Sequence, residues 1–247
     1  MTTGAQRRAF ASITAVMVLL LSSCGSDSDP SGGPTSTARK VQPPGMDVTF
    51  RWIESPDFDL MSPSVTAIRA FVESYELARD GRDPTWGYPG FVESSPLPIE
   101  QMIDFDGMSF SFSGSFFYRV LNHHDDGALS SYTLCRYGYF STQDSRWSPG
   151  GKDSDWWDPR PITLTLKRAG TPPPDAQRGP RRSPLVDVFG DWKIVEFDFA
   201  PRDPEVGDTA EYAQCAADLT GIPAVETDQD RPPLPLPPSP GWPGAGL

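Results

Sequence analysis

A long β-hairpin constrains the fold of this chain more than any other segment. Residues 108–123 are rich in Phe, Tyr and Val, Asp126-Gly127 offers a two-residue turn with positive φ, and residues 129–141 return. With that turn, Tyr118 lies opposite Cys135. The face expected to be in the core then carries Phe116, Tyr118, Val120, Cys135, Tyr137 and Tyr139, and the other face carries Arg119 and Arg136. A slip of one residue would exchange the two faces.

One long helix precedes this hairpin. Ser62-Pro63 is typical of a helix start, with serine as the N-cap and proline in the first turn, and Gly81 marks the end. Apolar residues recur between them at helical spacing: Val65, Ile68, Phe71, Val72 and Tyr75. Arg69, Glu73 and Glu76 fall on the opposite face of this helix.

The remaining periodic segments indicate an α+β fold. Alternating apolar residues predict strands near 48–52, 162–166 and 192–199, and residues 210–219 are expected to form a short closing helix. One helix before a run of antiparallel strands predicts a helix packed on a curved antiparallel sheet. The helical run 67–78 with its terminal Gly81, and the Gly-Asp-Trp start of 190–197, resemble the NTF2-like cone fold. A β-sandwich with one helix, or another helix-on-sheet fold, is the alternative.

The N-terminal segment has the organisation of an export signal. Arg7-Arg8 precede an apolar run over 9–21, and the small pair Ser22-Ser23 precedes Cys24. The Leu-Ser-Ser-Cys box resembles that of bacterial lipoproteins. The resemblance implies a diacylglyceryl group on the thiol of Cys24, which becomes the mature N-terminus and anchors the chain stably through two acyl chains. The arginine pair is compatible with both the general secretory and the twin-arginine export route.

The acidic composition argues against nucleic-acid partners. Asp and Glu number 33 against 21 Lys and Arg, and removal of the signal takes away two further arginines. Such a chain repels phosphate backbones and anionic lipid headgroups. The 28 prolines, together with the excess of arginine over lysine, are typical of a GC-rich genome such as an actinobacterial one.

Composition divides the chain into four parts. Residues 1–23 form the signal peptide, and 24–46 are a flexible, lipidated tether rich in Ser, Gly, Pro and Thr. Residues 47–222 form a single α+β domain, which is long enough to bury a core. Residues 223–247 are a proline-rich tail that we expect to be extended or disordered.

Two cysteines remain once Cys24 is assigned to the lipid. Cys135 and Cys215 would lie in an oxidising compartment outside the membrane, where two thiols are more often bridged than free. We therefore predict a disulfide between them. The alternative is a pair of free cysteines packed as small hydrophobic residues.

The sequence offers little support for catalysis. It contains no Gly-x-Ser-x-Gly, no phosphate-binding loop and no dinucleotide fingerprint. Its two histidines, His123 and His124, are followed by Asp125-Asp126 at the predicted hairpin tip. Adjacent residues on a strand point to opposite faces, so we expect a polar tip there and neither a metal nor a cofactor.

We expect instead a lipid-anchored envelope protein without enzymatic activity, which binds an apolar or amphipathic ligand, or a partner protein, between helix and sheet. Candidate lining residues are Phe71, Tyr75, Phe110, Phe112, Phe117 and Trp192, and Trp156 and Trp157 stand in an acidic loop. Most of these residues serve equally well in a core. The alternatives are an envelope hydrolase or isomerase that uses acidic pocket residues, and a structural protein without a ligand pocket.

Overall fold

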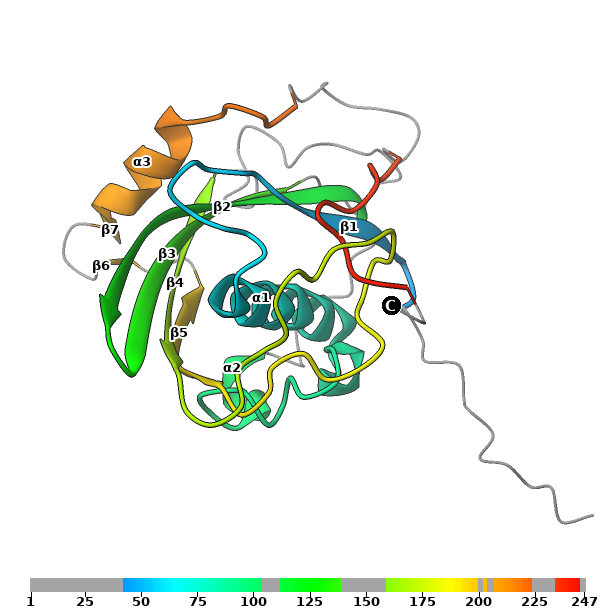
Figure 1. Ribbon diagram of the computed structural model, residues 1–247. Coiled ribbons are helices and arrows are strands. Elements are labelled where there is room, and N and C mark those ends of the chain that lie inside the picture. The colour runs from blue at the N-terminus through cyan, green and yellow to red at the C-terminus, as the bar shows by residue number, and fades with distance from the viewer. Residues whose placement is uncertain are drawn as a thin grey trace, which may run out of the picture. The chain divides into compact units, whose positions relative to one another are not determined.

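Five strands form one curled sheet in the order β1-β2-β3-β4-β5 (Figure 1). The computed structural model describes residues 42–103, 112–138, 159–199, 202–203, 207–223 and 234–244. The sheet comprises β1 (Met46–Trp52), β2 (Phe112–Asp126), β3 (Leu129–Tyr137), β4 (Arg160–Lys167) and β5 (Lys193–Phe199). The other elements are α1 (Pro63–Gly81), the 3-10 helix η1 (Pro84–Trp86), α2 (Ile99–Met102), the two-stranded sheet of β6 (Arg202–Asp203) and β7 (Gly207–Asp208), and α3 (Ala210–Ala217). The predicted α+β class is confirmed.

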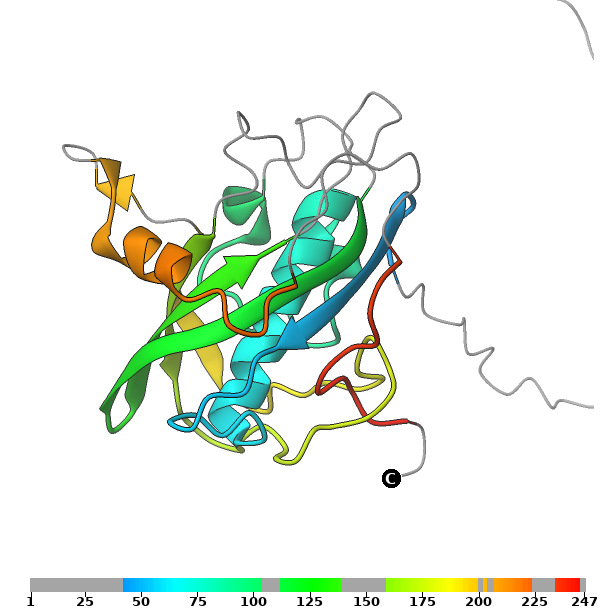
Figure 2. The ribbon, with the colours of Figure 1, turned by 90° about the horizontal axis from the view of Figure 1, so that it is seen from above.

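The concave side of the sheet holds α1, whereas α3 lies on the outer side (Figures 1 and 2). The helix begins as predicted, because Pro63 is its first residue and the Ser62 hydroxyl accepts a hydrogen bond from the Val65 N–H at 3.3 Å. The helix ends at Gly81, and the next residue, Arg82, takes a left-handed φ of 53°.

The sheet is mixed, which corrects the expected antiparallel arrangement. β1 pairs in parallel with β2, from Met46 opposite Phe112 to Trp52 opposite Tyr118, and the three other pairings are antiparallel. Parallel neighbours need a crossover connection, and the segment that contains α1 supplies it. Alternation over 48–52 identified the strand but carries no information about its direction.

The register of the β2–β3 hairpin also differs from the expected one by a single residue. Tyr118 lies opposite Arg136 and not opposite Cys135, because the turn falls one residue later and a bulge follows between Val120 and Asn122. Arg136 therefore points into the core with Tyr118. Cys135 lies opposite Arg119, on the outer face.

A second apolar cluster on the outer face contains the predicted disulfide between Cys135 and Cys215, which is present in the structure. Phe117 and Tyr137 pack around it. The Tyr137 hydroxyl donates to the carbonyl oxygens of Cys215 and Asp218, both at 3.0 Å. The disulfide and these contacts fasten α3 to the back of the sheet.

The C-terminal tail is not a free segment where the structure describes it. Residues 234–244, called the strap below, run beside β1 (Figures 1 and 2), and Trp242 is only 1% exposed. Proline-rich composition favours an extended backbone, but an extended backbone can still pack when its side chains and carbonyls find partners. This part of the tail is therefore extended, one of the two predicted states, and it packs against the domain.

Several predictions fall on residues outside the described ranges. These are the signal peptide, Cys24 and most of the tether, together with Phe110, Trp156 and Trp157. Among the residues that the structure describes, no helix is long and apolar enough to cross a membrane.

Candidate functional site

The central helix is buried on all sides, so its charged face lies inside the protein. Every residue from Val65 to Ala78 is buried, and Arg69, Glu73 and Glu76 are at most 2% exposed. The reason is the curl of the sheet. Phe71 and Tyr75 pack towards β5, while the opposite face of α1 meets β1, β2 and β3, where polar partners receive the charges.

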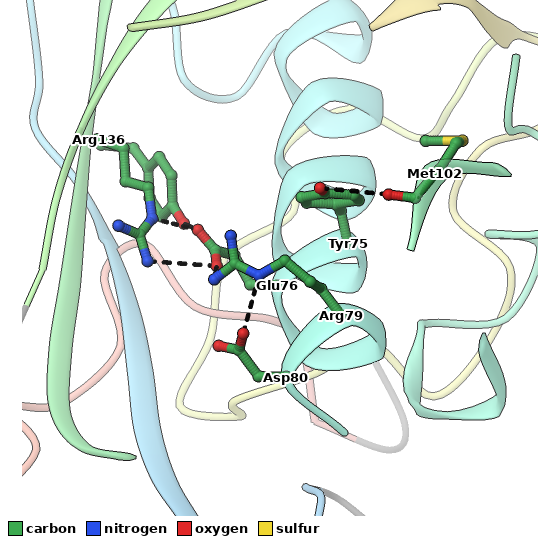
Figure 3. A network of polar contacts seen from close by, with 7 residues as sticks. Tyr75, Glu76, Arg79, Asp80, Met102 and Arg136 are labelled. Carbon is green, nitrogen blue, oxygen red and sulfur yellow. Dashed lines mark hydrogen bonds and ion pairs between the residues drawn. The ribbon is translucent and has the colours of Figure 1, made fainter. Parts of the chain in front are cut away.

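The first buried cluster is centred on Glu76 (Figure 3). Its carboxylate accepts hydrogen bonds from the Tyr118 hydroxyl at 2.8 Å and from Arg79 Nη2 at 2.8 Å. Arg136 of β3 donates through both Nε and Nη2. Burial alone would raise the pKa of Glu76, but Arg136 and Arg79 outweigh it and hold the pKa below its ordinary value. Glu76 is therefore an ionised carboxylate that joins α1 to two strands.

The second buried cluster is centred on Glu73. Its carboxylate accepts hydrogen bonds from Trp52 Nε1, the Tyr88 hydroxyl and Trp242 Nε1, each at 2.8 Å. All three donors are neutral, and burial raises the pKa of Glu73 above its ordinary value despite the nearby Arg69. The donors come from β1, from the segment after η1 and from the strap. Because protein donors occupy both of its oxygens, Glu73 has no open face for a substrate.

The predicted ligand-lining residues are placed in two separate groups. Phe71 and Tyr75 make edge contacts with Phe197, with ring centroids 5.0 and 4.6 Å apart, and Phe112 and Trp192 belong to the same core. Phe117 lies on the opposite face of the sheet, beside the disulfide. The structure thus brings the first group together as packed core side chains, which fill the space between helix and sheet.

An open groove of about 450 Å³ lies on the outer face of the sheet. Alternation along four strands directs polar side chains to this face. The walls are formed by Asn122 and His124 of β2, Ser131 and Thr133 of β3, Thr163 and Thr165 of β4, and Glu196 and Asp198 of β5, with Tyr132, Leu164 and Phe197 also contributing. The groove therefore combines hydroxyl, amide, imidazole and carboxylate groups with apolar surface.

Hydrogen bonds across the strands order one wall of this groove. The hydroxyls of Ser131 and Thr165 are 3.0 Å apart, and Thr165 also donates to a Glu196 carboxylate oxygen at 2.7 Å. These contacts fix one carboxylate of the site. The other, Asp198, lies opposite Thr163 in the neighbouring row.

His123 and His124 point to opposite faces of the sheet, as expected for adjacent residues of a strand. His124 is an exposed residue of the groove, whereas the His123 ring stacks on Tyr132 with centroids 5.5 Å apart and contacts Phe58 edge-on. Within the described ranges, no group of three His, Cys, Asp or Glu side chains is placed to hold a metal ion.

Sequence reasoning missed the groove although a signal for it was present. The threonines of β4 alternate with Ile162, Leu164 and Leu166, which marks a strand with one apolar and one hydroxyl-bearing face. The signal identifies a polar face but not its neighbours, because strand order and the β2 bulge decide which polar residues meet.

No family model, curated protein or solved structure matches this chain. The geometry of the described residues is therefore the basis for inferring function.

Proposed function

We propose that this chain is a lipid-anchored, extracytoplasmic binding protein, whose domain takes an amphipathic ligand or a segment of a partner protein in the outer groove. The groove itself carries this proposal, since polar side chains from four strands converge there around accessible apolar surface. The space between α1 and the sheet, where we first expected the ligand, is occupied by Phe71, Tyr75 and Phe197.

The position of the groove supports this assignment. Gln42, the first described residue, precedes the start of β1, and β2 begins at the same end of the sheet because the two strands are parallel. His124 and Ser131 lie near the hairpin tip, at the opposite end. A tether that leads from Cys24 into β1 therefore joins the domain at the end of the sheet opposite the hairpin tip.

The chemistry of the groove restricts the ligand. Glu196 and Asp198 give its walls negative charge, and the hydroxyl and amide groups around them accept and donate hydrogen bonds. The site thus favours a polar group that donates hydrogen bonds, such as an amine or a hydroxyl, attached to a small apolar body. Anionic headgroups are disfavoured.

The position of α1 within the curled sheet supports a finer proposal about the fold. We infer that the domain is a variant of the NTF2-like cone, because a single long helix lies within the concave side of a strongly curled sheet. The parallel β1 and the strap are the features that distinguish this variant.

Native mass spectrometry of the lipidated protein, purified from its own membrane, tests the binding proposal. We expect the wild-type protein to carry a bound ligand or partner. The Thr163→Arg variant should lack it, because the arginine side chain fills the groove. Thr85→Arg, at an exposed position of η1, is the matched control and retains the bound species. Absence of any bound species from the unmodified protein, or equal retention by Thr163→Arg, would contradict the assignment.

A further inference from the structure

The strap binds the edge of β1 as an extended peptide. The Ser239 N–H donates to the carbonyl oxygen of Phe50 at 3.2 Å, and the Ser239 carbonyl accepts from the Trp52 N–H at 2.6 Å. Further along, the Thr49 hydroxyl donates to the carbonyl of Leu236 at 2.7 Å. The strap makes bridges with β1 and with Arg181 only at single residues and forms no continuous ladder. On its other side the strap makes three backbone hydrogen bonds with residues 179–181, at 2.9–3.1 Å. Backbone and side-chain contacts therefore both hold it.

The indole of Trp242 enters a site made by α1. Its Nε1 donates to Glu73 Oε2 at 2.8 Å, and the Arg69 guanidinium lies over the ring, 4.5 Å from its centroid. Tyr88 meets the ring edge-on at a centroid distance of 5.7 Å. Arg69 Nη2 also donates to the carbonyl of Gly241 at 2.8 Å. The site therefore recognises an aromatic face, a ring N–H and the preceding carbonyl at once.

The backbone of Gly241, which precedes Trp242, also fits closely against its surroundings. Gly241 has a φ of 65°, and a Cβ at this position would lie 2.1 Å from the carbonyl oxygen of Gly179. Only glycine fits there without displacement of the backbone. The bound motif is thus an extended segment that contains Gly-Trp.

Covering the core does not require the charged side chains of Arg69 and Glu73. Apolar residues of similar volume cover a core at least as well as buried ionic groups, because taking Arg69 and Glu73 out of water costs free energy. What Arg69 and Glu73 add is selectivity: a segment without a ring N–H loses one of the hydrogen bonds that Glu73 accepts inside the protein. The site has the properties of a peptide-recognition site, with backbone pairing for affinity and a side-chain pocket for specificity.

We propose that the edge of β1 and the Arg69–Glu73 cluster form a binding site for an extended, tryptophan-bearing peptide segment of a partner protein, and that the strap is its resident occupant. The site is separate from the outer groove. A partner segment gains access when the strap dissociates from the site. The strap stays covalently attached to the domain and can therefore rebind.

Peptide exchange on a cut form of the protein tests this. The full chain, with a protease site inserted between Gln229 and Asp230, is folded first and then cut, so that the strap is held only by its contacts. The probe is a fluorescent peptide of residues 234–244. The matched peptide replaces Trp242 with benzothienylalanine, which keeps the ring shape but has sulfur in place of the N–H.

We expect the cut protein to exchange its strap for the tryptophan peptide, and the sulfur peptide to bind about 10-fold to 100-fold more weakly, as loss of a buried hydrogen bond implies. Glu73→Gln should bring the affinities of the two peptides closer together. The uncut protein should bind the probe more weakly than the cut protein, because its own strap competes at high effective concentration.

Three results would overturn the proposal: no exchange after prolonged incubation, equal binding of the two peptides, or equal binding by cut and uncut protein. If the cut protein unfolds once its strap is lost, recovery of folded circular dichroism on adding the tryptophan peptide, but not the sulfur peptide, supports the site. Failure of the tryptophan peptide to restore the fold, or equal recovery with both peptides, refutes it.

Discussion

Replacement of Arg136 by methionine should destabilise the domain strongly, because it removes a charge partner from a fully buried carboxylate. Arg136 is 3% exposed and donates to both oxygens of Glu76, which is 0% exposed. Methionine keeps much of the contact with Phe116, whose ring lies 4.7 Å below the guanidinium carbon. The variant therefore tests the charge more than the packing.

The expected magnitude follows from what Glu76 retains. Breaking a buried ion pair from one side costs roughly 3–5 kcal/mol. Arg79 and Tyr118 still bind the carboxylate, which places the expected loss at about 3 kcal/mol. For a domain of this size, that corresponds to a fall in melting temperature of about 6–12 °C. Arg182→Met, which removes an exposed pair with Asp47, is the control and should cost less than about 1 kcal/mol.

The effect should also depend on pH in a defined direction. In the unmodified protein the pKa of Glu76 lies below its ordinary value, so its stabilising contribution is complete above about pH 4.3 and is lost as the pH falls through the folded-state pKa. Without Arg136 the pKa of Glu76 rises. Acidification then protonates Glu76 and removes the buried charge that destabilises the variant. The gap in stability between the two proteins should therefore shrink on acidification.

Urea unfolding at pH 7 and pH 5, followed by circular dichroism, measures both quantities. A loss below about 1 kcal/mol at pH 7 would refute the reasoning, because it would show that Glu76 is solvated or protonated in the folded protein. A gap that widens towards pH 5 would refute the assignment of the ionised state.

Three further predictions concern other parts of the molecule. Cys24→Ala should abolish fatty-acid labelling and membrane retention, because it removes the thiol that the lipid-transfer step needs; unchanged labelling on membrane fractionation would count against the lipoprotein assignment. Replacing Cys135 and Cys215 together by alanine should cost about 4 kcal/mol, since the bridge closes a long loop; urea unfolding measures this, and a cost near zero would show that native strain cancels the constraint. Trp242→Ala should cost about 3–5 kcal/mol, whereas Leu234→Ala, at a residue 87% exposed, should cost almost nothing; equal melting temperatures would mean that the strap does not close the core in solution.

Local patterns in the sequence predicted the elements but not all of their partners. The capping of α1 by Ser62, the strand character of β4 and the position of α3 depend on neighbouring residues, and all three are confirmed. The pairing of Cys135 with Cys215 was predicted from their number and from the expected oxidising compartment, without knowledge of the fold.

The errors arise where the outcome depends on distant contacts. A bulge after Val120 reversed the face of Cys135 and placed Arg136 beside Glu76, and no local propensity announces such a bulge. Helical periodicity separates the charges of α1 from its apolar residues. It does not show that a curled sheet covers both faces.

The candidate site was harder to predict than the fold. Aromatic residues such as Phe71 fit a pocket and a core equally well, and only packing decides between them. The outer groove is a product of strand order, which brings together polar residues from four separate segments.

The contact between the strap and β1 imposes an order of events on biogenesis. Thr49 and Leu236 are 187 residues apart, so the free edge of β1 stays open until nearly the whole chain is available. Folding that depends on such distant contacts is slow, because the chain must first close a large loop. A chain synthesised N-terminus first therefore completes the sheet edge only after Leu236 has been added, and a late segment locks the first strand.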